Sequence, residues 1–142
     1  MNKKLTYFLL AVMILTGLSS CQNKTKNFLV KKWDCVQVEN LAPLDKHFIS
    51  KEDSLVAVKV EAALTTLSWT FNKDNTYYCS TMGNRITVQG TYEISEDEKT
   101  LFLTPSSKNN INAYTITSIS DIELTLTSRA TTVPLVLHFS PH

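Results

Sequence analysis

The segment from Ile86 to Ile94 constrains the fold more strongly than any other part of the chain. Apolar residues or glycine occupy every second position, and polar residues fill the positions between them: Thr87, Gln89, Thr91 and Glu93. Successive side chains of a β-strand point to opposite faces, so a period of two is typical of a strand with one buried face. We therefore predict a strand over these nine residues.

Seven further segments are rich in β-branched and aromatic residues, which favour strands. In chain order, the eight predicted strands are Leu29–Glu39, Leu67–Phe71, Thr76–Ser80, Ile86–Ile94, a strand containing Leu101 and Leu103, Asn112–Ile119, Ile122–Thr127 and Val133–Phe139. Short strands separated by regular turns indicate an all-β barrel or sandwich. We expect an eight-stranded antiparallel up-and-down barrel, because closure removes exposed strand edges, with a β-sandwich as the alternative.

The segment from Leu41 to Thr66 carries two competing patterns. Ser50-Lys51-Glu52-Asp53 resembles a helix start, and apolar residues recur afterwards near helical spacing. Val56, Val58, Val60 and Ala62 also alternate as a strand would. We predict a short helical insertion after the first strand, from about Lys51 to Ala63, because valine disfavours helices only weakly.

The first residues have the features of an export signal. Lys3 and Lys4 precede an apolar run, Leu5 to Leu15, that is too short to span a bilayer. The following Leu18-Ser19-Ser20-Cys21 resembles the lipobox of bacterial lipoproteins. That resemblance implies cleavage before Cys21 and lipidation of its sulfur, whereas an ordinary secretory signal is the alternative. Several acyl chains on one residue would anchor the protein stably to a membrane.

This interpretation divides the chain into three parts. Residues 1–20 form the signal peptide, residues 21–28 form the lipidated cysteine with a polar tether, and residues 29–142 form a single barrel domain. Gln22 differs from the aspartate that retains lipoproteins at the inner membrane of enterobacteria. By that analogy we expect a location in the cell envelope, at the outer membrane and facing the periplasm.

Composition excludes nucleic acid as a partner. Removal of Lys3 and Lys4 with the signal leaves 12 of the 14 basic residues against 13 acidic ones. The mature chain therefore lacks the excess of positive charge that is typical of nucleic-acid-binding proteins. Once Cys21 is lipidated, the remaining cysteines are Cys35 and Cys79. We expect them to be small buried residues rather than a disulfide, because the predicted strands do not make them neighbours.

We predict no enzymatic activity, no cofactor and no metal site. The chain has no G-x-S-x-G element, and its histidines are His47, His138 and His142. His138 and His142 have the spacing of a helical metal site, but Pro141 between them disfavours a helix at this position. The acidic run Glu96-Asp97-Glu98 is expected to be a solvated turn.

Four short motifs resemble those of small lipocalin-like lipoproteins from Bacteroidetes. Thr70–Tyr77 is similar to their "TF…DGTY" hairpin, Gly90–Tyr92 to "GxY", Thr100–Leu103 to "TLxL", and Lys31–Trp33 to the opening "GxW". Lys31 and Asn75 replace glycines of that pattern, and Asn40 to Thr66 does not align with it. The resemblance implies a barrel and, by analogy, a ligand-binding role.

Aromatic residues on the predicted inner face form the candidate site. Trp69, Phe71 and Tyr77 fall on one side of a hairpin, and the remaining candidates are Trp33, Tyr92 and Tyr114. Aromatic walls with hydroxyl groups suit a small apolar or amphipathic ligand. Alternatively, the same side chains fill the core, and the protein is a structural or interaction module that meets a protein partner in the envelope. Gly90 marks either a gap beside Tyr92 or a bend in the barrel.

Overall fold

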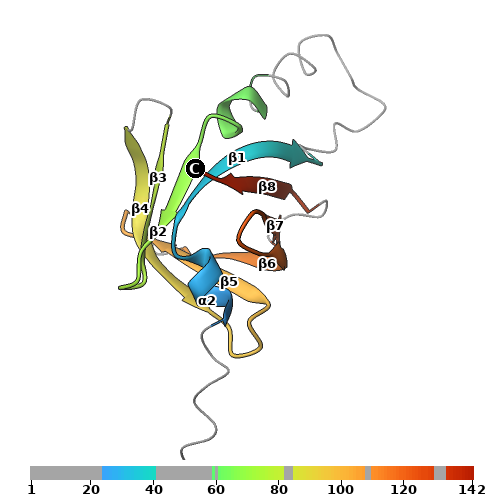
Figure 1. Ribbon diagram of the computed structural model, residues 1–142. Coiled ribbons are helices and arrows are strands. Elements are labelled where there is room, and N and C mark those ends of the chain that lie inside the picture. Colours follow the sequence, from blue (N-terminus) through green and yellow to red (C-terminus); the bar gives the residue numbers. More distant parts are fainter. Residues whose placement is uncertain (1–23, 41–58, 60, 82–84, 108–109, 130–133) are drawn as a thin grey trace, which may run out of the picture.

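The computed structural model describes residues 24–40, 59, 61–81, 85–107, 110–129 and 134–142. Its strands are β1 (Lys32–Glu39), β2 (Ser68–Phe71), β3 (Thr76–Ser80), β4 (Ile86–Ile94), β5 (Thr100–Pro105), β6 (Asn112–Ile119), β7 (Leu124–Ser128) and β8 (Val136–Pro141). They form one closed barrel in chain order, and β8 pairs with β1 (Figure 1). All neighbouring strands are antiparallel, which confirms the predicted eight-stranded barrel.

The barrel has two unlike ends. At one end, here called the closed end, lie helix α2 (Lys24–Leu29) and the turns 72–75, 95–99 and 120–123 (Figure 1). At the other, here called the open end, β1 finishes and β2, β4, β6 and β8 begin. The β2–β3 turn begins at Asn72, whose amide donates to the Thr76 carbonyl, and Asn75 has a positive φ of 66°. Asparagine tolerates this left-handed conformation, so the turn forms without the glycine usual in such hairpins.

Helix α2 differs from the polar tether predicted for residues 21–28. The Thr25 hydroxyl donates to Glu98 Oε2 at 2.8 Å, and the Lys26 ammonium donates to Asn75 Oδ1 at 2.6 Å. Leu29 at the end of the helix is fully buried. Residues 24–28 therefore belong to the folded domain, held by contacts with distant turns that this short polar segment does not reveal.

The helical insertion after β1 is confirmed where the structure describes it. Residues 61–64 are helical and lead directly into β2, near the open end (Figure 1). The Thr65 and Thr66 hydroxyls donate back to helix carbonyls, at 3.0 Å to Glu61 and 2.7 Å to Ala63. Most of the predicted span, from Lys51 to Val58 and Val60, lies outside the described residues.

One hydrophobic core runs through the barrel, from Leu29 and Trp33 near the closed end to Val38 and Leu137 near the open end. The six largest fully buried side chains are Trp33, Phe71, Leu29, Leu101, Leu124 and Leu126. The predicted burial of Trp69 and Tyr92 is also confirmed. Cys35 and Cys79 are both buried and free, as expected for small core residues rather than a disulfide.

Leu124→Ala is expected to lower the free energy of unfolding by about 2–5 kcal/mol, because Leu124 is 0% exposed and its loss leaves a cavity. Urea denaturation of the folded domain measures this change. Ile122→Ala is the matched control, since Ile122 lies two residues away and is 76% exposed. A comparable loss in both variants would contradict the inward orientation of Leu124.

Candidate functional site

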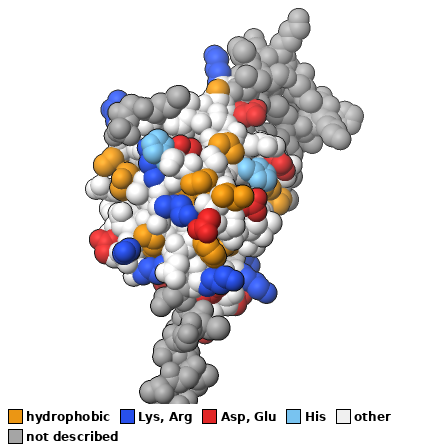
Figure 2. Space-filling model, in the orientation of Figure 1, with side chains coloured by type: hydrophobic (Ala, Val, Ile, Leu, Met, Phe, Trp, Pro, Cys, Tyr) orange, Lys and Arg blue, Asp and Glu red, His pale blue; other side chains and the backbone are white. Residues whose placement is uncertain are grey.

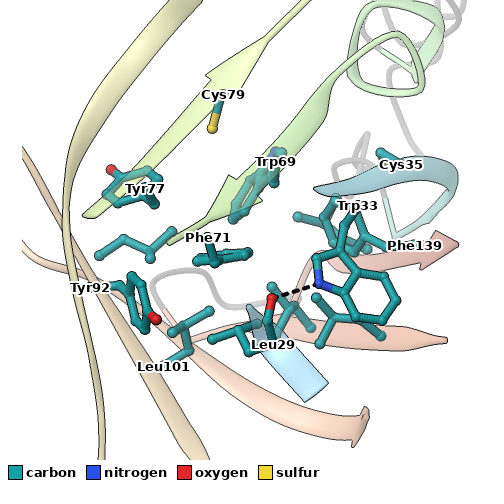
Figure 3. Close-up of a cluster of buried hydrophobic side chains, with 14 of the residues drawn as sticks. Leu29, Trp33, Cys35, Trp69, Phe71, Tyr77, Cys79, Tyr92, Leu101 and Phe139 are labelled. Carbon is teal, nitrogen blue, oxygen red and sulfur yellow. Dashed lines mark hydrogen bonds between the residues drawn. The ribbon is translucent and has the colours of Figure 1, made fainter. Parts of the chain in front are cut away.

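Five of the six predicted site residues meet inside the barrel. Trp69 on β2 is in ring contact with Phe71 (6.3 Å between centroids) and edge-to-face with Tyr114 on β6 (5.7 Å). Phe71 in turn stacks on Tyr77 at 6.2 Å and meets the edge of Tyr92 at 5.3 Å. Figure 3 shows Trp69, Phe71, Tyr77 and Tyr92 turned toward one another. The aromatic wall predicted from strand parity therefore exists as a continuous set of contacts.

Trp33, the sixth residue, lies against α2 at the closed end. Its indole Nε1 donates to the Leu29 carbonyl at 3.0 Å, and the ring is fully buried (Figure 3). The Lys31 ammonium lies 5.1 Å from the ring centroid. All these contacts hold the helix on the barrel, so Trp33 seals the closed end and does not line the open one.

The hydroxyl groups of the three tyrosines have different surroundings. Tyr92 donates to the Asn72 carbonyl at 2.7 Å and so supports the β2–β3 turn. The hydroxyls of Tyr77 and Tyr114 have no hydrogen-bond partner in the part of the chain that the structure describes. In the described residues, the side-chain oxygens that are fully enclosed and lack a hydrogen-bond partner are Thr70 Oγ1 and Glu98 Oε1. The Tyr77 and Tyr114 hydroxyls are not among them. Both phenols can therefore accept or donate a further hydrogen bond.

Cys79 lies next to these two phenols. It faces Trp69 across the β2–β3 pair and is one inward position from Tyr77. Burial raises the pKa of Tyr77 to about 12, with further contributions from Cys79 and Tyr114, and burial followed by Cys79 raises that of Tyr114. Burial also raises the pKa of the Cys79 thiol to about 12. All three groups are therefore neutral at physiological pH.

One inward-facing position near the open end is exposed. Val88 pairs with the inward-facing Cys79, so it points into the barrel, yet it is 39% exposed. Ile86 pairs with Ser80 across a register shift, so it does not continue the inward series, and it is 52% exposed. The sequence pattern predicted that both would be buried, and this part of the prediction is wrong. Parity correctly gives the direction of Val88, which lies too far along the strand to be covered. It fails at Ile86, because the register shift between Cys79 and Ser80 puts Ile86 out of phase with Val88.

A groove of about 530 Å³ lies on the barrel wall where β1 and β2 meet. Asp34 is its central charged group: it accepts hydrogen bonds from Ser68 at 2.5 Å and His142 Nδ1 at 2.7 Å. Burial alone would raise the pKa of Asp34, but these bonds outweigh it and the pKa is lowered. Lys32 Nζ lies 3.1 Å from His142 Nε2. The sequence did not reveal this cluster, because its members are far apart in the chain.

The cluster is not arranged as a hydrolase triad. A nucleophilic serine donates its proton to a histidine, whereas here Ser68 donates to the carboxylate and His142 binds the other oxygen. A second histidine, His138 on β8, pairs separately with Glu39 at 3.1 Å. Within the described residues, no three histidine, cysteine or acidic side chains are placed to hold a metal ion. Asp97 accepts from Ser95 and from the Lys99 amide, so it orders the β4–β5 turn.

A closed eight-stranded barrel whose one end is covered by an N-terminal helix, over an aromatic interior, is the architecture of a lipocalin-like protein. The family model for the lipocalin-like domain matches residues 29–126. The chain therefore belongs to the lipocalin-like domain family, and the resemblance in the short motifs is confirmed.

Three solved structures from Bacteroides species share the fold. A DUF4847 family protein from Bacteroides vulgatus has a TM-score of 0.52 and 17% identity, covering 81% of this chain and 94% of that chain. A lipocalin-like protein from Bacteroides uniformis has a TM-score of 0.53 and 12% identity, covering 80% of this chain and 98% of that chain. An uncharacterized protein from Bacteroides eggerthii has a TM-score of 0.51 and 11% identity, covering 80% of this chain and 99% of that chain. At these identities the similarity shows the fold alone. No curated protein matches the chain in sequence.

Proposed function

We propose that the protein binds a small amphipathic molecule inside its barrel, which the molecule enters from the open end. The observation that supports binding is the pair of hydroxyls on Tyr77 and Tyr114, which lack partners in the described residues and belong to rings in the aromatic cluster inside the barrel. A ligand would place apolar atoms on the aromatic rings and a neutral polar group at the phenols. Such a site, mostly apolar with a few placed polar groups, is typical of small-molecule pockets.

The charge of the site indicates which kind of polar group the ligand carries. Tyr77, Tyr114 and Cys79 are neutral, and they can donate hydrogen bonds but supply no positive charge. An uncharged acceptor, such as a carbonyl, ester or hydroxyl group, suits these donors. A carboxylate would lose its hydration there without a countercharge, which is costly.

Native mass spectrometry of the protein extracted from its own host tests this proposal. Its denatured mass gives the covalent mass, and any excess in the native spectrum is bound ligand. We expect an excess that is lost in the Tyr77→Phe/Tyr114→Phe variant. Tyr92→Phe is the matched control, because the Tyr92 hydroxyl is already bonded to the Asn72 carbonyl; this variant should keep the ligand.

A second candidate function is a structural or interaction module for a protein partner in the envelope. The packed core favours it, since the Trp69 ring already contacts Phe71 and Phe139, with centroids 6.3 Å and 5.3 Å away. Two results together would favour this function over ligand binding. The native spectrum would show no excess mass, and the Tyr77→Phe/Tyr114→Phe variant would differ from the unmodified protein only in its stability.

We further propose that the protein is a lipoprotein anchored through Cys21 at the outer membrane, facing the periplasm. The short apolar leader and the lipobox-like Leu18–Cys21 support this assignment. No helix among the described residues is long and apolar enough to cross a bilayer.

Cys21→Ala is expected to abolish fatty-acid labelling of the protein and its cleavage by the lipoprotein signal peptidase, because the sulfur that carries the lipid is gone. Metabolic labelling in the host, followed by immunoprecipitation, measures both. Cys35→Ala is the matched control, because Cys35 is a free cysteine buried in the barrel, and this variant should be labelled normally. Labelling of the Cys21→Ala protein would refute the anchor.

A further inference from the structure

Helix α2 is attached rigidly to the closed end of the barrel. Thr25 bonds to Glu98 on the β4–β5 turn, Lys26 bonds to Asn75 on the β2–β3 turn, and the Leu29 carbonyl accepts from Trp33 on β1. Three separate parts of the barrel therefore hold one short helix. The direction in which the chain leaves the barrel toward its N-terminus is set by the domain itself.

The segment that connects this helix to Cys21 is very short. Only Gln22 and Asn23 separate Cys21 from Lys24, the first residue of α2. Three Cα–Cα steps span at most about 11 Å. A lipid on Cys21 would thus keep the start of α2 within about 11 Å of the cysteine's Cα, whatever conformation the two residues adopt.

We propose that in the lipidated protein the closed end of the barrel lies against the membrane surface and the open end points away from it. This orientation rests on the proposed lipidation of Cys21, and it assigns a lipid surface as the partner of the closed end.

The side chains at the closed end suit such a contact. Ile122, on the β6–β7 turn, is a large apolar side chain that is 76% exposed, so it can enter the headgroup region of a bilayer that lies against this end. The exposed lysines at this end are Lys24, Lys73 and Lys99, and they can bind lipid phosphates. Acidic residues lie among them, as Figure 2 shows around this end, so net charge does not drive the contact. The anchor and its short connection supply the orientation.

The orientation determines where a ligand enters. The eight residues of β1 extend about 26 Å at the usual rise per residue, and the tilt of barrel strands reduces this to roughly 20 Å along the axis. The open end would therefore lie roughly 20 Å beyond the membrane-facing end. Ligands or partners would reach Tyr77 and Tyr114 from the aqueous side, not directly from the bilayer.

Collisional quenching by nitroxide-headgroup lipids tests the orientation, because it acts only near contact. A bimane label is placed at Lys73→Cys on the β2–β3 turn or at Ser107→Cys after β5; both positions are exposed. The native Cys35 and Cys79 are buried, with thiol pKa values raised to about 11 and about 12 by burial, so the label spares them. The lipidated proteins are reconstituted into phosphatidylcholine vesicles with or without the nitroxide lipid.

We expect quenching at position 73 to exceed that at position 107 several-fold. A flexible Gly-Ser linker inserted between Asn23 and Lys24 should reduce this difference, because the barrel could then rotate over the surface. Equal quenching in the unmodified protein, or stronger quenching at position 107, would overturn the orientation while leaving the anchor intact. Failure of the lipid-bearing protein to bind vesicles would overturn the anchoring and the orientation together.

Discussion

Trp33→Ala is expected to lower the free energy of unfolding by about 3–5 kcal/mol, one of the largest effects of any single substitution in this protein. Trp33 is 0% exposed, so the variant leaves a large cavity at the closed end. It also removes the donor to the Leu29 carbonyl, a bond of 3.0 Å that holds α2. The Leu29 carbonyl would keep its bond from the Lys31 amide at 2.8 Å but lose the one from Trp33, which adds a smaller cost of its own. Urea denaturation followed by circular dichroism measures the total.

Two further variants separate the contributions to this effect. Trp33→Phe keeps much of the apolar volume but not the Nε1 donor, so it should cost less than alanine while still weakening the attachment of α2. Val36→Ala, on the same strand but 56% exposed, should change stability by less than about 0.5 kcal/mol. If Trp33→Ala is no more damaging than Val36→Ala, the closed end is not sealed as described.

The strands could be predicted because their signals are local. The alternation from Ile86 to Ile94 and the turn residues Asn72–Asn75 need no knowledge of the remainder of the chain, and both are found where expected. Closure of the barrel was also predictable, because eight short strands with short turns leave few other ways to cover every edge. Parity then placed Trp69, Phe71 and Tyr77 on one face, and the structure brings their rings together.

The features missed from the sequence all depend on which distant residues meet. The helix α2 contains only Phe28 and Leu29 as apolar residues, so it carries no helical pattern, and its position depends on Glu98 and Asn75. Asp34 meets Ser68 and His142 across separations of 34 and 108 residues. Strand register decides such pairs, and composition does not encode it. Trp33 was correctly predicted to be buried, but its end of the barrel was not predictable.

Gly90→Ala is expected to lower the free energy of unfolding by about 3 kcal/mol, because the added methyl has no room. A Cβ at Gly90 would lie 2.1 Å from the Thr104 carbonyl oxygen and 2.9 Å from the Pro105 Cα. Both are backbone atoms of β5, so β4 and β5 would have to separate. Gly90 therefore marks a close approach of two strands and not a gap beside Tyr92.

The sign of the Gly90→Ala effect is itself informative. Where space allows, replacing a strand glycine with alanine raises stability by roughly 0.5–1 kcal/mol, because glycine loses more conformational freedom on folding. The clash with β5 must therefore cost more than the stability that a glycine-to-alanine substitution ordinarily adds. Thr91→Ala is the matched control, since its side chain is exposed on the adjacent outward position. Gly90 also pairs with Tyr77, so separation of β4 from β5 should weaken ligand retention in the native mass spectrum as well. Unchanged or increased stability of Gly90→Ala would show that β5 can move at this point and that the close approach of the two strands does not require glycine.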